Sequence, residues 1–227
     1  TTSGALGPPN SGQSIGFWRD KSLSGYHAKV LTGAPKWLND GFNEKSCVDL
    51  TNDSFYLENS ANSFEGWEDI VIFATLYQTA FNHFSYILGK GTQTGWLNNN
   101  SHAFSWALNM HRADINSHKI WGPAINTTTG GNAYLRTSSD VIWTHDGFNG
   151  GPSLLTIRYS SNNSSGLSHN LVMKVNGSQF LQGNVTGPIK STSTTPVTIG
   201  GTGSGGGTWV GRISEVIISN QDLGNEN

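Results

Sequence analysis

The segment 103–110 alternates strictly between large apolar residues and small or polar ones. Its large side chains fall at every second position: Phe104, Trp106, Leu108 and Met110. Successive side chains of a β-strand point to opposite sides, so this period of two predicts a strand with one face against a core. The other face carries Ala103, Ser105, Ala107 and Asn109. It predicts either a shallow trough on a concave sheet or flat packing against a neighbouring element.

Other segments carry β-type patterns, and no segment has a convincing helical period. Glu68–Gln78 is apolar on both faces, which indicates a central strand that is covered on both sides or lines a groove. Asn176-Gly177, between two apolar runs, predicts a hairpin turn. In Trp209–Ser219 the apolar parity slips, and a bulge near Ser214–Glu215 would restore it.

The whole pattern predicts an all-β fold, an antiparallel β-sandwich of about a dozen short strands. Pro35–Asn43 is predicted as a loop, and Gly200–Gly207 as a loop joining two strands. A phosphate-binding loop would need a helix after these glycines, and the residues that follow are β-branched. The predicted strands are Ile15–Arg19, Ala28–Leu31, Ser46–Leu50, Ser54–Leu57, Glu68–Gln78, Phe84–Leu88, Ala103–Met110, Lys119–Ile125, Ala133–Arg136, Asp140–Trp143, Leu154–Ser160, Leu171–Asn176, Gln179–Leu181, Val197–Ile199 and Trp209–Ser219.

Length and composition limit the function classes. A chain of 227 residues is enough for one sizeable core, and its 10 Phe, 8 Trp and 6 Tyr argue against disorder. Charged residues make up 12% and the net charge is −2, so the sequence lacks the basic footprint of a nucleic-acid or anionic-membrane partner. No apolar run approaches the roughly 18 residues that span a membrane. The lone Cys47 is predicted to be a small core residue.

The order of several motifs resembles laminin-G-like domains of the concanavalin-A-like lectin/glucanase superfamily. The opening match is Trp18-Arg-Asp-Lys-Ser22, Gly25-Tyr-His-Ala28, Pro35 and Asp40-Gly-Phe-Asn43, followed by Val48-Asp-Leu50 and Phe55-Tyr-Leu57. The closing match runs from Val197-Thr-Ile-Gly-Gly201 to Trp209-Val-Gly-Arg-Ile-Ser-Glu-Val-Ile-Ile-Ser-Asn-Gln-Asp-Leu223. The resemblance implies a jelly roll over residues 15–223. Residues 1–14 have linker composition where the family has an opening strand, and 224–227 form a tail, so we expect a domain cut from a longer protein.

The superfamily scaffold also carries glycosidases and lyases, so we searched for their chemistry. Retaining glucanases place an E-x-D-x-x-E motif on one strand, with carboxyls about 5 Å apart. Here Glu65-Gly-Trp-Glu68-Asp69 does not match that spacing, and these carboxylates are predicted to be solvated charges at the entry to a strand. The R-x-E-x-R and Q-I/V-H strands of alginate lyases do not occur. The seven histidines show no metal-ligand spacing. No catalytic residue is predicted.

The resemblance raises calcium as a cofactor, because members of the superfamily often hold Ca²⁺ in rim loops. The candidate ligands are Asp146 and Asn149, within His145–Gly151. Their spacing is one residue short of the legume-lectin loop. A plain glycine-rich turn is the simpler interpretation.

Aromatic and amide residues in predicted loops are typical of neutral-glycan binding, in which rings stack on sugars and amides bind hydroxyls. The candidate ligand-binding residues are Trp96, Asn98, Trp121, Tyr134, Trp143, His145 and Asn149. We therefore expect a non-catalytic recognition or adhesion module of a larger extracellular protein, binding a glycan or a protein surface through its rim loops. The alternative is a structural or decoration component of a virion or surface fibre, in a homo-oligomer or a larger particle. A polysaccharide-degrading enzyme is a distant third.

Overall fold

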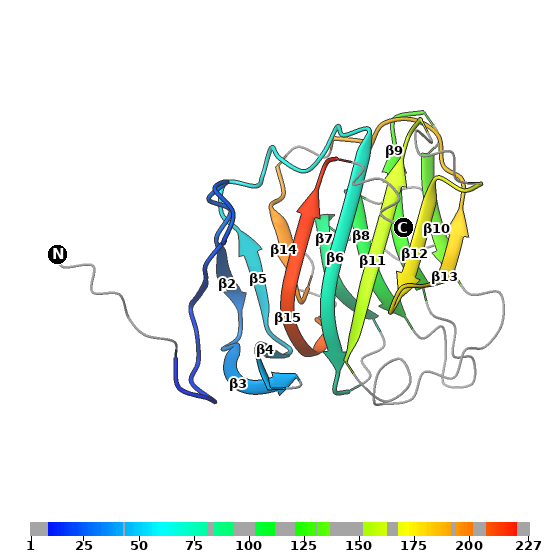
Figure 1. Ribbon diagram of the computed structural model, residues 1–227. Helices are drawn as coiled ribbons and strands as arrows, with labels where there is room; N and C mark the ends of the chain where they lie inside the picture. Colours follow the sequence, from blue (N-terminus) through cyan, green and yellow to red (C-terminus); the bar gives the residue numbers. More distant parts are fainter. Residues whose placement is uncertain are drawn as a thin grey trace.

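The computed structural model describes residues 9–42, 44–80, 84–92, 103–111, 121–129, 131–136, 152–162, 168–191, 194–201 and 208–221. These residues form two antiparallel sheets that face each other, and they contain no helix (Figure 1). The predicted all-β sandwich is confirmed. Since the described part of the chain is all strand and loop, it contains no helix that could cross a membrane.

One sheet has eight strands in the order β1-β2-β5-β14-β7-β8-β9-β10, and the other has seven in the order β13-β12-β11-β6-β15-β4-β3. The eight strands are β1 (Phe17–Trp18), β2 (Ala28–Thr32), β5 (Ser54–Leu57), β14 (Val197–Ile199), β7 (Phe84–Thr92), β8 (Ala103–His111), β9 (Trp121–Thr127) and β10 (Gly131–Arg136). The seven strands are β13 (Ser178–Gly183), β12 (Leu171–Val175), β11 (Ser153–Ser160), β6 (Asp69–Gln78), β15 (Val210–Ser219), β4 (Lys45–Thr51) and β3 (Lys36–Phe42).

The last two strands of the chain lie inside the sheets rather than at their edges. β14 pairs with β5 on one side and β7 on the other. β15 pairs with β4 and β6. The segment with the closing family match therefore supplies an interior strand to each sheet (Figure 1).

The strict alternation in β8 sets its two faces as predicted. Trp106 and Leu108 are buried in the core between the sheets, and the Trp106 Nε1 donates to the Phe64 carbonyl at 2.7 Å. Ala107, between them, lies on the other side of the sheet, where it packs with Ala124 and the ring of Tyr86. Ala107 and Ala124 are both buried. The small-residue face of β8 is therefore covered at this point and does not form an open trough.

Two irregularities were also predicted correctly. The β15–β6 pairing shifts register between Ile213 and Glu215, which lets Ile213, Val216 and Ile218 all pack toward the core. The β12–β13 hairpin turns at Asn176 and Gly177, with φ of 50° and 79°. Positive φ at both central positions is the requirement of a type I′ turn.

The loop prediction for Pro35–Asn43 was wrong, because Lys36–Phe42 forms β3 at the edge of the seven-stranded sheet. The turn-type residues before Phe42 are accommodated by a register shift between Leu38 and Phe42, so the strand continues around them. Gly41 lies so close to Cys47 that a Cβ there would be 1.9 Å from its Sγ. Cys47 is buried as predicted, and burial raises the pKa of its thiol to about 11. The predicted strand Asp140–Trp143 lies outside the described residues.

Candidate functional site

Most of the sequence-predicted ligand residues lie outside the described part of the chain. These are Trp96, Asn98, Trp143, His145 and Asn149, together with the candidate calcium ligand Asp146. They remain predictions.

Trp121 and Tyr134 are placed by their backbone. Trp121 is the first residue of β9, where it pairs with Arg136, and Tyr134 lies in β10, paired with Ala124. The structure therefore places these two candidates in adjacent strands at one edge of the eight-stranded sheet, so their prediction as loop residues was wrong.

The described residues contain a second candidate, the outer side of the seven-stranded sheet, which we call the front face. In β6 the core takes Ile72, Ala74 and Leu76, and the alternate positions point outward. The front face consists of those outward residues and their cross-strand neighbours: Asp49, Phe73, Thr75, Tyr77, Leu154, Thr156, Lys174, Arg212, Glu215 and Ile217. The two-sided apolar pattern of Glu68–Gln78 thus reflects one core face and one partly open face.

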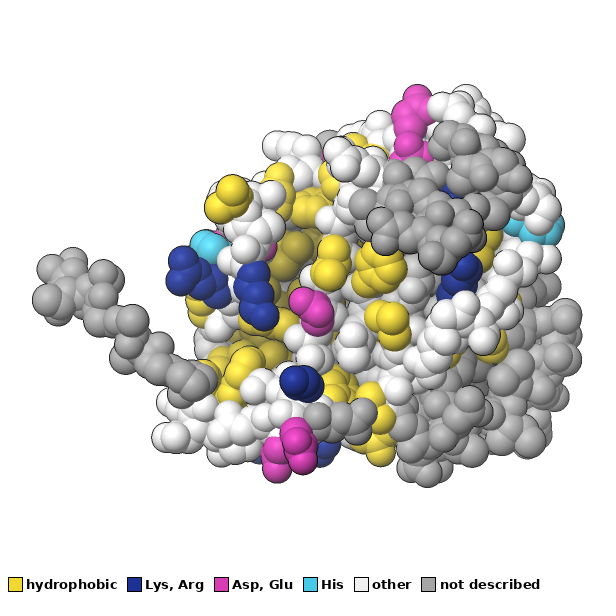
Figure 2. Space-filling model, in the orientation of Figure 1, with side chains coloured by type: hydrophobic (Ala, Val, Ile, Leu, Met, Phe, Trp, Pro, Cys, Tyr) yellow, Lys and Arg dark blue, Asp and Glu magenta, His cyan; other side chains and the backbone are white. Residues whose placement is uncertain are grey.

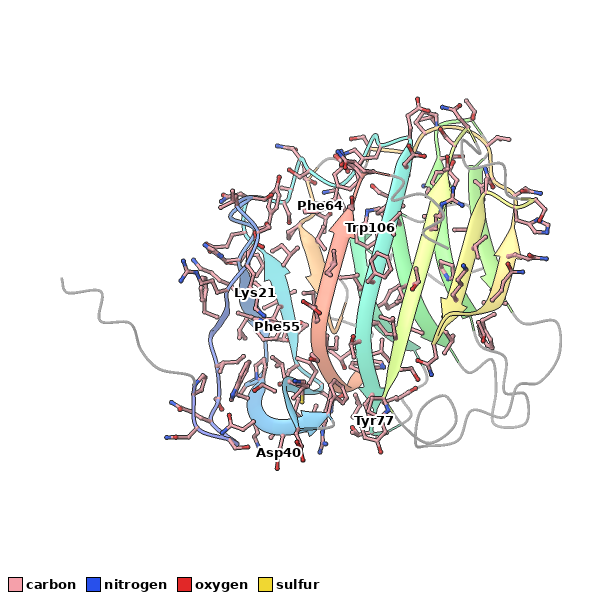
Figure 3. All side chains as sticks on the ribbon, viewed as in Figure 1. Lys21, Asp40, Phe55, Phe64, Tyr77 and Trp106 are labelled. Atoms are coloured by element: carbon pink, nitrogen blue, oxygen red, sulfur yellow. The ribbon has the colours of Figure 1, made fainter. Side chains whose placement is uncertain are left out.

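A polar group occupies one end of the front face. The Arg212 Nε lies 3.5 Å from the Asp49 Oδ2, and its guanidinium carbon lies 6.0 Å from the centre of the Tyr77 ring. Phe42 meets the other side of that ring edge-on at 6.3 Å. The Arg212 and Asp49 side chains are 32% and 23% exposed, so a ligand could reach both. Tyr77 lies at the end of the sandwich opposite Phe64 and Trp106 (Figure 3).

An apolar strip adjoins the polar group. Ile217 pairs with Phe73 across β15 and β6, and Leu154 lies one row away on β11, paired with Thr75. Leu154 and Ile217 are 42% and 47% exposed. Figure 2 shows hydrophobic side chains gathered over the middle of this face, with acidic and basic side chains among them. Apolar surface next to aromatic, guanidinium and carboxylate groups can stack on a ligand and hydrogen-bond its polar edge.

The carboxylate of Glu65 is committed to an internal ion pair, so its prediction as a solvated charge was wrong. Lys90, fully buried on β7, lies 3.6 Å from the Glu65 Oε2, and the Glu65 side chain is only 5% exposed. The Lys90 ammonium also donates to the carbonyls of Ser60 (3.1 Å), Ala61 (2.7 Å) and Thr195 (2.8 Å). Burial lowers the pKa of Lys90, and the Glu65 carboxylate partly opposes this shift.

The remaining oxygens of this group are also occupied. Ser191 donates to the Glu65 Oε1 at 2.7 Å and Ser105 donates to the Oε2 at 3.2 Å. Glu68, by contrast, is exposed as predicted and accepts from the Ser161 hydroxyl and the Asn162 amide at 2.5 and 2.6 Å. Both carboxylates therefore hold loops in place. In the described residues, no three His, Cys, Asp or Glu side chains come close enough to hold a metal ion.

Comparisons with known proteins agree with this architecture. No family model and no curated protein matches the chain. The K499G mutant of NanB sialidase from Streptococcus pneumoniae has a similar structure, at 18% identity and a TM-score of 0.55, covering 79% of this chain and 26% of that one. The receptor binding domain of botulinum neurotoxin mosaic serotype C/D is 14% identical with a TM-score of 0.53, covering 93% and 49%. Mouse laminin alpha1 chain, domains LG4-5, is 13% identical with a TM-score of 0.47, covering 70% and 36%.

The chain is thus an antiparallel β-sandwich of the jelly-roll type, which is the fold class that the sequence predicted. It spans about a quarter to a half of the length of the three chains above. Sequence reasoning found the strand that carries Phe73 and Tyr77 but missed the front face as a site. The signal was present in the apolar outward positions of that strand.

Proposed function

We propose that the chain is a non-catalytic recognition module that binds a glycan or a protein surface as part of a larger extracellular protein. The observation that carries this is the front face, where a partly exposed apolar strip adjoins the Tyr77, Arg212 and Asp49 group. A surface of this kind can bind a ligand by stacking and hydrogen bonding, without a cleft.

The use of the acidic groups supports a binding role. Several described carboxylates are engaged in structural contacts: Asp20 and Asp53 with backbone amides, Glu58 with Lys29, and Glu65 with Lys90. The botulinum domain of similar fold is named for receptor binding, which agrees with a contact function for this architecture.

Glycan-array binding tests the proposal and separates its two candidate surfaces. Loss of a glycan signal in Tyr77→Ala or Phe73→Ala would place the ligand on the front face. Loss in Trp96→Ala or Trp143→Ala would place it on the predicted rim loops. Tyr56→Ala, on the outward side of β5 in the other sheet, is the matched control and should bind normally. Release of reducing sugar from a polysaccharide would overturn the non-catalytic proposal.

The exposed strip also favours the second candidate function, a structural component of a virion or surface fibre. Leu154 and Ile217 would then be covered by a neighbouring subunit rather than by a ligand. Light scattering coupled to size exclusion would then show a defined oligomer, and a structure of that oligomer would show an interface above roughly 1,000 Å² over this strip. A monomer at high concentration that binds a glycan would rule this candidate out.

A further inference from the structure

The loop between β1 and β2 carries an apolar residue at its apex. Leu23 is 106% exposed, so its side chain makes almost no contact with the rest of the protein. A lone exposed leucine on a mobile loop would mean little, because single surface apolar residues are common. This loop, which we call the Leu23 loop (residues 19–26), is instead fastened by internal hydrogen bonds and by aromatic contacts with the sandwich.

The Asp20 carboxylate organises the Leu23 loop from within. It accepts from the Ser22 amide at 2.7 Å, the Ser22 hydroxyl at 2.8 Å and the Tyr26 amide at 2.9 Å. The Asp20 amide donates to the His27 Nδ1 at 3.1 Å. Burial would raise the pKa of Asp20, but the bonds from Ser22 and Tyr26 outweigh it and lower that pKa. The carboxylate therefore stays ionised and turned inward.

Aromatic contacts anchor both ends of the loop to the sandwich. Trp18 meets the core residue Phe55 at 6.1 Å, edge to face. Tyr26 meets Phe64 at 4.7 Å, and its hydroxyl contacts the Ser63 hydroxyl at 3.1 Å. The loop that carries Leu23 is thus already ordered, so binding through Leu23 does not have to pay the entropy of ordering the loop.

Two basic residues lie beside Asp20 in the loop. Arg19 and Lys21 flank Asp20 in sequence and are both exposed. The ionised Asp20 carboxylate lies between them, so the two cations and one anion leave the loop with a net charge of +1. Phe17, at the base, is 45% exposed and packs beside the His27 ring at 5.0 Å. Figure 2 shows basic and hydrophobic side chains together on this flank of the molecule, and Lys21 is labelled there in Figure 3.

We propose that the Leu23 loop docks into the surface of an anionic lipid membrane. Its groups follow the layers of such a surface: an apolar apex for the acyl boundary and cations behind it for the lipid headgroups. The chain's net charge of −2 predicts no general attraction to anionic membranes, but the two exposed cations are local to this loop. The inference is independent of the front face and of any ligand bound there.

Sedimentation with vesicles tests the proposal on the whole chain. The probes are phosphatidylcholine vesicles and vesicles with about 30% phosphatidylserine, at up to several millimolar lipid. We expect partition into the phosphatidylserine vesicles only, lowered about tenfold by Leu23→Ala and about fivefold by Lys21→Gln. Lys45→Gln makes the same charge change on the other sheet and should partition like the unaltered chain.

Several outcomes overturn the proposal. They are the absence of partition at the highest lipid concentration, equal partition into both vesicle types, or a loss in the Lys45→Gln control equal to that in Lys21→Gln. If the chain does not partition, the alternative is that the Leu23 loop binds a pocket on a protein partner. Leu23→Ala should melt at the same temperature as the unaltered chain, because its side chain makes no packing contacts, so a fold defect would be recognised.

Discussion

Removing the buried ammonium of Lys90 should be the most destabilising single charge deletion in the described part of the chain. In Lys90→Met the volume is kept, but the carbonyls of Ser60, Ala61 and Thr195 lose their donor and the Glu65 carboxylate loses its cation. Breaking a buried ion pair from one side costs about 3–5 kcal/mol, and each orphaned buried acceptor adds about 1–3 kcal/mol where water does not replace it.

Ser105 and Ser191 still donate to Glu65 in the variant, so part of the charge remains compensated. We therefore expect a loss of about 4–5 kcal/mol. This is a large share of the roughly 5–15 kcal/mol that stabilises a domain of this kind.

Urea unfolding at pH 7, followed by tryptophan fluorescence, gives the free energy of unfolding. Lys29→Met is the matched control, because Lys29 pairs with Glu58 at 2.5 Å but its side chain is 46% exposed. An exposed pair contributes little to stability, because solvent screens the two charges. The double variant Lys90→Met/Glu65→Gln should recover part of the loss. A cost for Lys90→Met no greater than that of Lys29→Met would refute the reasoning.

Three further predictions concern buried groups and one turn. Burial, with the nearby Glu68 and Asp69 charges, raises the pKa of Tyr159 from 10.0 to about 12, so the folded chain keeps a proton that the unfolded chain releases between these values. Stability should fall by about 3 kcal/mol as pH rises through that window, and Tyr159→Phe should abolish this part of the fall in urea titrations. The Cys47 thiol should react with a disulfide reagent at pH 8 only after denaturant is added; fast reaction with the native chain would contradict its burial. Gly200→Ala places a Cβ 2.7 Å from the Asp53 carbonyl at a φ of +82° and should cost about 2 kcal/mol or more, whereas Gly177→Ala, at +79° in open space, should cost about 1 kcal/mol; equal costs would contradict the contact.

Local patterns predicted the fold well, because the alternation of apolar and polar residues within a strand determines which face is buried. The alternation around Trp106, the Asn176-Gly177 turn and the bulge before Glu215 were all readable within a few positions. β3 was missed because its turn-type residues are accommodated by a register shift within an edge strand. A local sequence pattern does not predict such a shift.

Contacts between distant segments were not predictable in this way. The Lys90 ammonium binds Thr195, 105 residues away, and Ser191 reaches Glu65 across 126 residues. The residues around Lys90 and those around Glu65 do not indicate that these two side chains form a pair. The hydrogen bonds of the Asp20 turn, in contrast, reach at most seven positions along the chain, which is within the range of a local pattern.

The interior placement of β14 and β15 has a consequence for biosynthesis. Until Val197–Ile199 and Val210–Ser219 have left the ribosome, β5 and β7, like β4 and β6, are separated by a gap one strand wide. Until residues 197–219 are available, four strand edges of the two sheets therefore stay unpaired. A peptide covering those two strands is the natural candidate to complete a chain truncated before them, and such a two-piece molecule would report when the sandwich closes.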